Sequence, residues 1–337
     1  MIALRIKEKI LVLLKEHREG LRQADIVKAL GVSRSYVSEI MKELIRAGIV
    51  KRVIESGIAK YVLAREQPFG EKKPKILKLG IIWSSEYPFI TYFGKYLKVE
   101  LNIQLEPIVY SNALEATWDA VTGKIDLVLS PLVTQFIYAS LTGGLTIIGG
   151  GASGGARLYE NPSSRTDASA SSKASTMDLL LTFGLRELGI PDTRRYYASS
   201  GEEIMMLLAS GRVKYAAIWE PLATRLKKMG FKEIYTIDDL RLPHCCTLGA
   251  SRSLAPDYKT RIKKIYGKAL EEFAKKPEQA LEWYALKTGI QIDLLKESIK
   301  HYIYKPYLEI QSSVIAFNKA GLHIPSPSTL KEVIEYN

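Results

Sequence analysis

Apolar positions with helical spacing predict two helices close together near the start of the chain. Residues 22–30 and 34–47 each place their apolar residues on one face: Ala24, Ile26, Val27 and Leu30 in the first, then Val37, Ile40, Met41 and Leu44 in the second. Gly31 provides the turn between them, and Ser33 is placed to cap the second helix. An earlier helix is marked by Ile6, Ile10, Leu11 and Leu14.

Two β-rich runs follow these helices, at 49–54 and 58–63, around the turn Ser56-Gly57. Three helices and a two-stranded ribbon predict a winged helix-turn-helix domain over residues 1–64. Its exposed polar residues are the expected DNA contacts: Arg34, Ser35, Tyr36, Ser38 and Lys42 on the second helix of the pair, and Lys51, Arg52 and Lys60 on the wing. The alternative is a protein–protein module, since three-helix units of this spacing serve that role too.

The distribution of charge favours nucleic acid as the partner of this domain. The chain of 337 residues has a net charge of +12. Through residue 76 there are 17 Lys and Arg against 9 Asp and Glu, a surplus of 8, and the other 261 residues contribute only 4 more. Basic residues therefore concentrate where the helix-turn-helix would meet phosphates. A merely solvated basic surface is the alternative interpretation.

Strand and helix patterns alternate after a charged, Pro- and Gly-containing linker over 65–75. Strands are expected at Ile76–Trp83, Ile103–Tyr110 and Ile125–Leu129, with helices at Tyr92–Leu101 and Ala113–Thr122. This rhythm predicts a largely parallel sheet covered by helices on both faces. A second βα series is expected from about 165 to 240. Helical periodicity then marks the tail from 258, in the segments 262–273, 277–286 and 292–303.

Three segments of the larger part carry a family resemblance: Trp118–Ser130, with its helix-Gly-x-x-Asp-strand pattern, Ser172–Met177, and Leu208–Pro221, which ends in Glu-Pro. They resemble type II periplasmic-binding-protein domains, in particular the sulfonate, nitrate and thiamine-pyrimidine solute-binding family. The resemblance implies two α/β lobes over 76–337, with lobe 1 at about 76–155 and 245–337 and lobe 2 at about 156–244. The chain departs from the family in Lys214, where Asp is usual, and in the expected lack of a secretion signal.

The first 60 residues resemble the winged-helix domains of archaeal and bacterial regulators. The overall order, a DNA reader followed by a small-molecule sensor, is similar in outline to LysR regulators, without their long linker helix. The fold class expected is therefore multidomain: an α+β winged helix, a two-lobed α/β binding-protein-like domain and a helical C-terminal tail.

The resemblance also implies where a ligand lies, since such lobes close over it at strand ends and helix N-termini. The expected ligand-binding residues lie at such places or in the Gly-rich segment 143–155: Trp83, Ser84, Tyr87, Ser130, Ser153, Ser175, Thr176, Met177, Trp219 and Glu220. For each aromatic residue, core packing is the alternative role. The Gly-rich segment lacks the Lys-Ser/Thr of a phosphate-binding loop, and we expect it to permit close approach or bending of the lobes.

The two cysteines of the chain are the neighbours Cys245 and Cys246. Adjacent cysteines rarely form a disulfide because the ring is strained, and their spacing is not that of a metal site. His244 is expected to be structural. We therefore predict no metal, no cofactor and no catalytic residue. With no membrane-length apolar run, the expected location is the cytoplasm.

These observations predict a one-component transcription regulator rather than an enzyme. Its expected partners are double-stranded DNA, a small polar or anionic effector and a second copy of the chain, because one winged helix contacts few phosphates. No membrane partner is expected. The alternative is an enzyme on the same scaffold, similar to a dehydratase or a thiamine-pyrimidine synthase. The sequence does not determine the identity of the effector, the operator sequence, or whether the protein activates or represses transcription.

Overall fold

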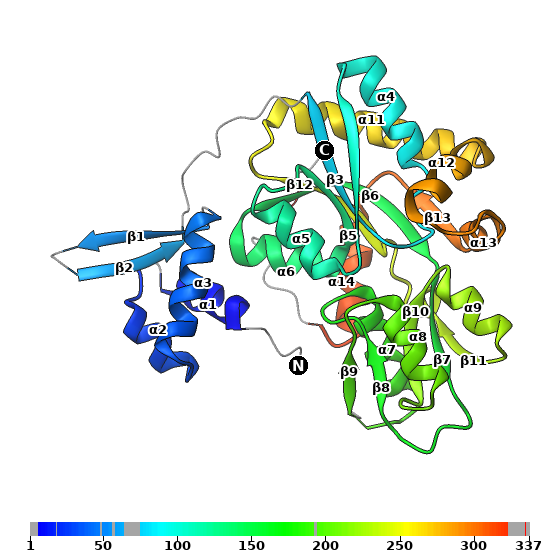
Figure 1. Cartoon of the computed structure of the whole chain (residues 1–337), viewed down its shortest axis with the longest axis horizontal. Helices are drawn as coiled ribbons and strands as arrows, with labels where there is room; N and C mark the ends of the chain where they lie inside the picture. Colours follow the sequence, from blue (N-terminus) through cyan, green and yellow to red (C-terminus); the bar gives the residue numbers. More distant parts are fainter. Residues whose placement is uncertain are drawn as a thin grey trace.

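Three folded parts make up the computed structural model, and the third is inserted between two segments of the second (Figure 1). The structure describes residues 6–17, 19–47, 49–55, 58–63, 75–191, 194–322 and 334. A small N-terminal domain lies beside two larger units, each built on its own sheet. We call the unit with the six-stranded sheet lobe 1 and the unit with the five-stranded sheet lobe 2. No helix within the described ranges is both long and apolar enough to span a membrane.

The N-terminal domain has the predicted three helices and antiparallel ribbon. Its elements are α1 (Ile6–Glu16), α2 (Gln23–Leu30), α3 (Arg34–Arg46), β1 (Val50–Glu55) and β2 (Ile58–Leu63). Gly31 ends α2 with a φ of 64°, in the left-handed region that favours glycine. Ser33 Oγ accepts a hydrogen bond from the backbone N–H of Tyr36 at 3.2 Å. Both observations confirm the predicted helix-turn-helix, whose apolar stripes are buried. The turn at Ser56-Gly57 and all but the last residue of the linker 65–75 lie outside the described residues.

The six-stranded sheet of lobe 1 has the order β13-β6-β12-β5-β3-β4. Its strands are β3 (Ile76–Ile82), β4 (Gln104–Tyr110), β5 (Leu127–Pro131), β6 (Leu145–Gly154), β12 (Cys246–Ser251) and β13 (Tyr302–Lys305). The expected parallel pairing is confirmed for β3, β4 and β5, but the sheet as a whole is mixed. β3 runs parallel to β4 and β5, but β12 is antiparallel to β5 and β6. β12 enters this sheet from lobe 2, and not by a crossover from the neighbouring strand β5 or β6.

Helices cover both faces of this sheet. They are α4 (Ile90–Leu101) and α11 (Pro256–Lys275), which pack together, and α5 (Ala113–Val121) and α6 (Leu132–Thr142), which form the other pair (Figure 1). The predicted helices at Tyr92–Leu101 and Ala113–Thr122 are thus confirmed as α4 and α5. α5 and α6 lie between the sheet and the N-terminal domain, so they join the two parts of the molecule.

The five-stranded sheet of lobe 2 has the order β11-β7-β10-β8-β9. Its elements are β7 (Ala156–Glu160), β8 (Ser169–Ser171), α7 (Thr176–Glu187), β9 (Arg195–Tyr197), α8 (Gly201–Ala209), β10 (Tyr215–Trp219), α9 (Leu222–Lys228), β11 (Lys232–Thr236) and α10 (Ile237–Leu240). β7 was not anticipated, and it pairs antiparallel with β10 and β11. The chain enters lobe 2 through Gly154 and Gly155, which have φ of 82° and 68°. A Cβ on Gly154 would lie 2.1 Å from the carbonyl oxygen of His301.

The C-terminal tail is helical, with one exception. It comprises α11, α12 (Glu278–Thr288), α13 (Ile292–Ser298) and α14 (Ile310–Lys319). The helix expected over 292–303 ends at Ser298, and β13 follows and pairs with β6. The β-prone Tyr302-Ile303-Tyr304 can approach β6 closely because that strand is rich in glycine. The periodicity of the tail sequence alone could not show that residues 302–305 pair with β6.

Candidate functional site

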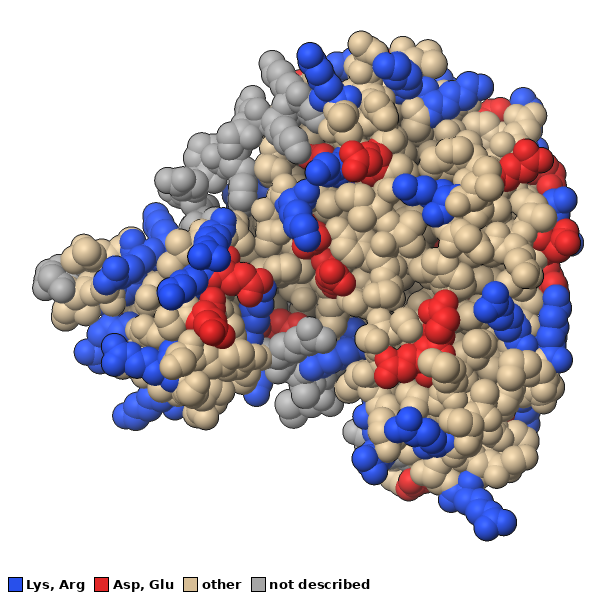
Figure 2. All heavy atoms as spheres, in the orientation of Figure 1, with Lys and Arg blue, Asp and Glu red and all other residues tan. Residues whose placement is uncertain are grey.

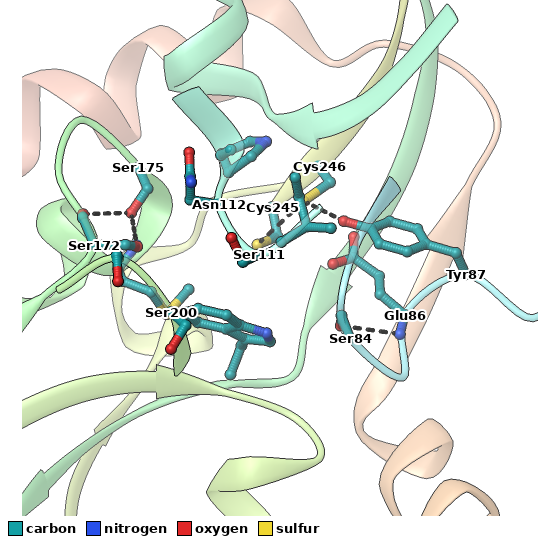
Figure 3. A pocket seen from close by; sticks show the side chains of 16 residues that line it. Ser84, Glu86, Tyr87, Ser111, Asn112, Ser172, Ser175, Ser200, Cys245 and Cys246 are labelled. Carbon is teal, nitrogen blue, oxygen red and sulfur yellow. Dashed lines mark hydrogen bonds between the residues drawn. The ribbon is translucent and has the colours of Figure 1, made fainter. Parts of the chain in front are cut away.

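A small pocket lies between the two lobes (Figure 3). The cavity volume is about 40 Å³, which is room for only a few water molecules. Residues after the ends of β3, β4, β8 and β9 meet there with the ends of β5 and β10 and the start of β12. The lining residues are Ile82, Ser84, Glu86, Tyr87, Ser111, Asn112, Ala113, Pro131, Ser172, Ser175, Met177, Ser199, Ser200, Trp219, Cys245 and Cys246.

Half of the predicted ligand residues line this pocket: Ser84, Tyr87, Ser175, Met177 and Trp219. The other half lie outside its lining: Trp83, Ser130, Ser153, Thr176 and Glu220. Two of these hydroxyls are engaged within the protein. Thr176 Oγ1 donates to the carbonyl oxygen of Cys245 at 3.1 Å, and Ser130 Oγ accepts from Thr117 Oγ1 at 2.8 Å. They therefore support the pocket wall without facing its interior.

Three of the helices that begin at the pocket are each capped by a polar side chain of its lining. Asn112 Oδ1 caps α5 by accepting from Glu115 N–H at 2.9 Å. Ser175 Oγ caps α7, and Ser200 Oγ caps α8, each at 3.2 Å from a backbone nitrogen. The positive ends of three helix dipoles and their remaining free N–H groups thus surround one small space. Such an arrangement suits a polar or anionic group.

A cluster of acidic side chains forms another part of the wall. The ligand atoms of Glu86, Cys245 and Cys246 lie within 4.8 Å of one another, and all three residues are buried. Tyr87 Oη donates to Cys246 Sγ at 3.0 Å. Burial raises the pKa of the Glu86 carboxyl and of the Cys246 thiol well above their usual values. The hydrogen bond from Cys246 Sγ lowers the pKa of the Cys245 thiol. These atoms could hold a metal ion, a possibility that the sequence did not indicate.

The two tryptophans named from the sequence hold the lobes together. Trp219 Nε1 donates to the carbonyl oxygen of Trp83 at 2.9 Å, which links the end of β10 in lobe 2 to the segment after β3 in lobe 1. Trp83 Nε1 donates in turn to the carbonyl oxygen of Thr288 at 2.9 Å. Trp219 also lines the pocket, so it combines an interlobe bond with a position in the lining.

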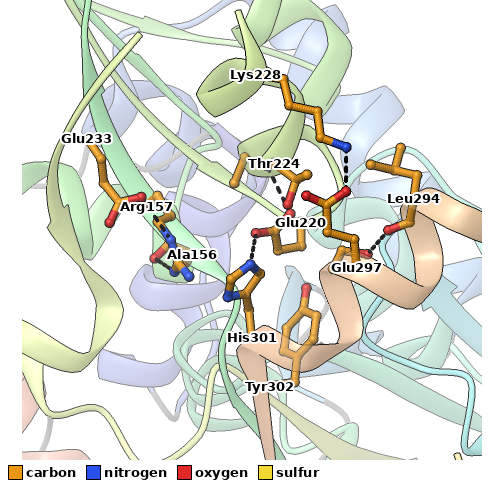
Figure 4. Close-up of polar contacts among 12 residues, drawn as sticks. Ala156, Arg157, Glu220, Thr224, Lys228, Glu233, Leu294, Glu297, His301 and Tyr302 are labelled. Carbon is orange, nitrogen blue, oxygen red and sulfur yellow. Dashed lines mark hydrogen bonds and ion pairs between the residues drawn. The ribbon is translucent and has the colours of Figure 1, made fainter. Parts of the chain in front are cut away.

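Glu220 lies on a different side of the lobe junction (Figure 4). Its Oε2 accepts from the backbone N–H of Thr224 at 3.0 Å, and its Oε1 lies 3.7 Å from His301 Nε2. Burial raises the pKa of the Glu220 carboxyl. Burial also lowers the pKa of His301, so the pair is close without being a strong ion pair. The Glu220 carboxylate, predicted from the sequence to bind a ligand, therefore accepts a hydrogen bond at the start of α9. The carboxyl group that lines the pocket is that of Glu86.

Sequence reasoning missed several lining residues. Ser111 and Asn112 follow β4, and Ser199 and Ser200 follow β9. Polar residues between a strand and a helix are the same signal that pointed to Ser84 and Ser175, so it was available for these too. Cys245 and Cys246 gave no such signal, because their proximity to Glu86 arises only when β12 enters the lobe 1 sheet.

The face of α3 predicted to read DNA is open to solvent. Arg34, Ser35, Tyr36 and Lys42 are exposed, and Ser38 is half-buried. On the ribbon, Lys51 and Arg52 are exposed, while Lys60 is half-buried. Lys and Arg side chains gather over the N-terminal domain in Figure 2. The predicted DNA contacts therefore lie on a domain with many exposed basic side chains.

The N-terminal domain contacts lobe 1 through α1. Lys15 Nζ donates to the carbonyl oxygen of Ser140 on α6 at 2.6 Å. Lys7 Nζ lies 3.6 Å from the ring centroid of Trp118 on α5, a cation–π contact. α5 and α6 both begin at residues that line the pocket, Ala113 and the cap residue Pro131. Two helices thus run from the pocket to the N-terminal domain.

Comparison with known proteins identifies both parts. Residues 9–53 match the IclR helix-turn-helix domain. Among curated protein sequences, none matches the chain significantly. A solved structure of the ligand-binding component of an ABC-type import system from Staphylococcus aureus, with zinc bound, is 18% identical with a TM-score of 0.63, and the match covers 77% of this chain and 98% of that one.

Two further solved structures share the same architecture. The alkanesulfonate-binding protein SsuA from Xanthomonas axonopodis pv. citri, bound to MOPS, is 15% identical with a TM-score of 0.63 over 78% of this chain and 99% of its own. The periplasmic nitrate-binding protein NrtA from Synechocystis PCC 6803 is 12% identical, with a TM-score of 0.63, and the match covers 79% and 87%. The chain joins an IclR-type helix-turn-helix domain to a periplasmic-binding-protein-like fold. At these identities the likeness establishes the fold alone.

Proposed function

We propose that the protein is a transcription regulator that binds duplex DNA through α3 and the wing and senses a small polar or anionic molecule in the interlobe pocket. The observation that carries this proposal is the pair of helices α5 and α6. Each begins at the pocket and contacts α1 of the DNA-reading domain farther along the chain.

The nature of the pocket supports a compact effector. Three capped helix N-termini surround it, and its cavity volume is about 40 Å³. The named structural neighbours bind an alkanesulfonate and nitrate. Small oxyanions and short sulfonates are therefore the first compounds to test.

The mode of coupling follows from the contacts of α1. An effector that favours one arrangement of the lobes moves the start of α5 or α6, and Lys7 and Lys15 transmit this change to the N-terminal domain. The effector then shifts a balance between two DNA-binding states by its difference in affinity for them. We propose a homodimer as the DNA-binding form, since two winged helices would be needed for tight specific binding.

Ligand binding and DNA binding by the full chain test this proposal together. Nitrate, sulfate and ethanesulfonate are titrated by calorimetry, and the affinity for a duplex selected from a random library is measured with and without each probe at constant ionic strength. Ser200→Ala removes a cap at the pocket and should weaken anion binding. Ser210→Ala, at the other end of α8, is the matched control. A DNA affinity that no probe changes would contradict the proposal, and chemical conversion of a probe would favour an enzyme.

A further inference from the structure

The sulfur and oxygen atoms of the acidic cluster have the spacing of metal ligands. Cys245 Sγ and Cys246 Sγ are 4.0 Å apart. In a tetrahedral zinc site with Zn–S distances of about 2.3 Å, two sulfurs lie about 3.8 Å apart. The Glu86 carboxylate completes a set in which all ligand atoms lie within 4.8 Å of one another. The sulfurs already have nearly this spacing, and the carboxylate oxygen would have to move closer by up to about an ångström to share the ion.

One atom of this cluster lacks a partner inside the protein. Glu86 is only 4% exposed, and its Oε1 has no hydrogen-bond partner among the described residues. The lining of the pocket, as far as the structure describes it, contains no Lys, Arg or His. A buried carboxyl oxygen that lacks a hydrogen-bond partner is costly to bury. A bound cation would remove this cost.

The surrounding backbone holds the three side chains rigidly. The N–H of Cys245 donates to Ala152 of β6 at 2.7 Å, and its carbonyl oxygen accepts from Leu132 N–H at 3.0 Å. Glu86 is held by its N–H, which donates to Ser84 Oγ at 3.1 Å. The hydroxyl of Tyr87 orients Cys246 Sγ from outside the ligand set. Ordered ligands with such supporting hydrogen bonds are typical of built metal sites.

We propose that Cys245, Cys246 and Glu86 form a binding site for a thiophilic divalent cation, zinc being the representative ion. Two sulfurs and one carboxylate match the ligand preferences of zinc, whereas magnesium and calcium take oxygen ligands. This proposal goes beyond the proposed function because it concerns ion binding, which can be measured without DNA or an effector.

A bound cation would also let the acidic ligands and an anionic effector share the pocket. Binding of a metal ion displaces the protons of the two thiols and of the buried carboxyl group, so the ligands then carry three negative charges. A divalent cation lowers this charge to one. Three protein ligands leave a fourth position on a tetrahedral ion. The sixteen-residue lining places this position in the pocket, where an anionic effector could bind the ion and face the capped starts of α5, α7 and α8.

Cobalt substitution tests the site in the full chain. The reduced, chelator-treated protein is titrated with Co²⁺ without oxygen, and the near-ultraviolet thiolate-to-cobalt bands and the visible d–d bands are recorded. The chain has two cysteines in all, so any thiolate band reports on Cys245 and Cys246. We expect one equivalent of Co²⁺, d–d bands of tetrahedral intensity, and displacement by Zn²⁺.

Variants separate this site from incidental binding. Cys245→Ser and Cys246→Ser should each halve the thiolate band per cobalt and weaken zinc binding more than about tenfold, and Glu86→Gln should keep the band but also weaken binding by about tenfold or more. Glu220→Gln, a buried carboxylate at the lobe junction outside the pocket, is the matched control and should change neither. Zinc should also slow alkylation of the wild-type thiols, which tests the site even if a variant misfolds.

Three results would overturn the proposal: no thiolate band, zinc affinity unchanged in a Cys245→Ser/Cys246→Ser double variant, or alkylation unaffected by zinc. Unchanged affinity in Glu86→Gln would reject the three-ligand site. Each outcome is independent of whether the protein regulates transcription.

Discussion

The N-terminal domain and the interlobe pocket present their polar residues in opposite ways. The proposed DNA-binding surface comes from one helix of 13 residues and a short ribbon, and most of its predicted contact residues are exposed. The pocket draws on loops and element ends from both lobes, separated by up to 164 positions, and buries Glu86, Ser175 and both cysteines. The surface of the N-terminal domain is formed by residues close in sequence and is open to solvent. The pocket depends on the packing of lobe 1 against lobe 2.

This difference has an energetic consequence. An exposed side chain on α3 can be replaced with little change in stability, because water replaces its lost interactions. A buried polar group at the pocket needs a partner within the protein, so its replacement affects folding and function together. Substitutions on α3 should therefore affect DNA binding alone, whereas substitutions at the pocket should affect ligand binding and stability.

The largest effect is expected from Asp178→Asn in lobe 2. Asp178 Oδ1 lies 2.8 Å from Arg195 Nη1, and its other oxygen accepts from Ala174 N–H at 3.4 Å, next to the pocket residue Ser175. Breaking this buried pair should cost about 3–5 kcal/mol of stability. Denaturant unfolding measures it. Glu297→Gln, which breaks an exposed pair with Lys228, should cost at most about 1 kcal/mol. Equal losses of stability in Asp178→Asn and Glu297→Gln would contradict the expected difference between buried and exposed polar groups.

An intermediate effect is expected from Arg34→Ala on the exposed face of α3. It should weaken binding to a selected duplex by about 1–3 kcal/mol and leave the melting temperature unchanged. Lys51→Ala on the wing should instead weaken binding to all sequences and reduce the salt slope by about 1. Fluorescence anisotropy with selected and scrambled duplexes distinguishes the two. A stability loss in Arg34→Ala as large as that in Asp178→Asn would show that this surface is not independent of the fold.

Lys15→Ala tests the link between the two regions. Loss of its bond to Ser140 should change the coupling between pocket and DNA by about 0.5–2 kcal/mol without changing either affinity measured alone. The readout is the ratio of DNA affinities with and without the anion probe that binds. Lys9→Ala, an exposed residue of the same helix, is the control and should leave that ratio unaltered. An unchanged ratio in Lys15→Ala would remove this contact from the coupling.

The smallest effect concerns Glu220 and pH. Burial raises its folded-state pKa above the usual 4.5, so the folded protein binds the proton more tightly than the unfolded chain. Its carboxylate therefore costs no stability below pH 4.5, and the cost grows as pH rises through the folded-state pKa. Glu220→Gln should gain stability relative to the parent over that window. Unfolding is followed from pH 4 to 7.5 in a His301→Asn background, which removes the neighbouring titration. A difference that shrinks with rising pH would refute this assignment.

The N-terminal domain could be predicted from the sequence because its signals are local. The stripe ending at Leu44, the turn at Gly31 and the cap at Ser33 each depend on neighbours within one or two helical turns. The same locality gave the early helices and strands of lobe 1. It failed at β13, where the choice between helix and strand is decided by β6, about 150 residues earlier.

The pocket could be predicted only in part. Polar residues at strand ends identified Ser84 and Ser175, because parallel strands bring such ends to one edge. Glu86 and the two cysteines meet through the antiparallel return of β12, which no local pattern encodes. Glu220 follows a strand as well, but its carboxylate accepts from the start of α9 and lies outside the pocket. Position after a strand thus locates a residue near the lobe junction without fixing the direction of its side chain.

The salt dependence of DNA binding by the full chain tests the central claim, that the exposed basic face of the N-terminal domain contacts duplex DNA. Affinity for the selected duplex is measured by anisotropy over a range of potassium chloride concentrations. We expect the logarithm of the association constant to fall linearly with the logarithm of the salt concentration, with a slope of about −0.9 per neutralised phosphate. Lys51→Ala should make this slope shallower. Absence of duplex binding, or an affinity insensitive to salt and to Lys51→Ala, would contradict it.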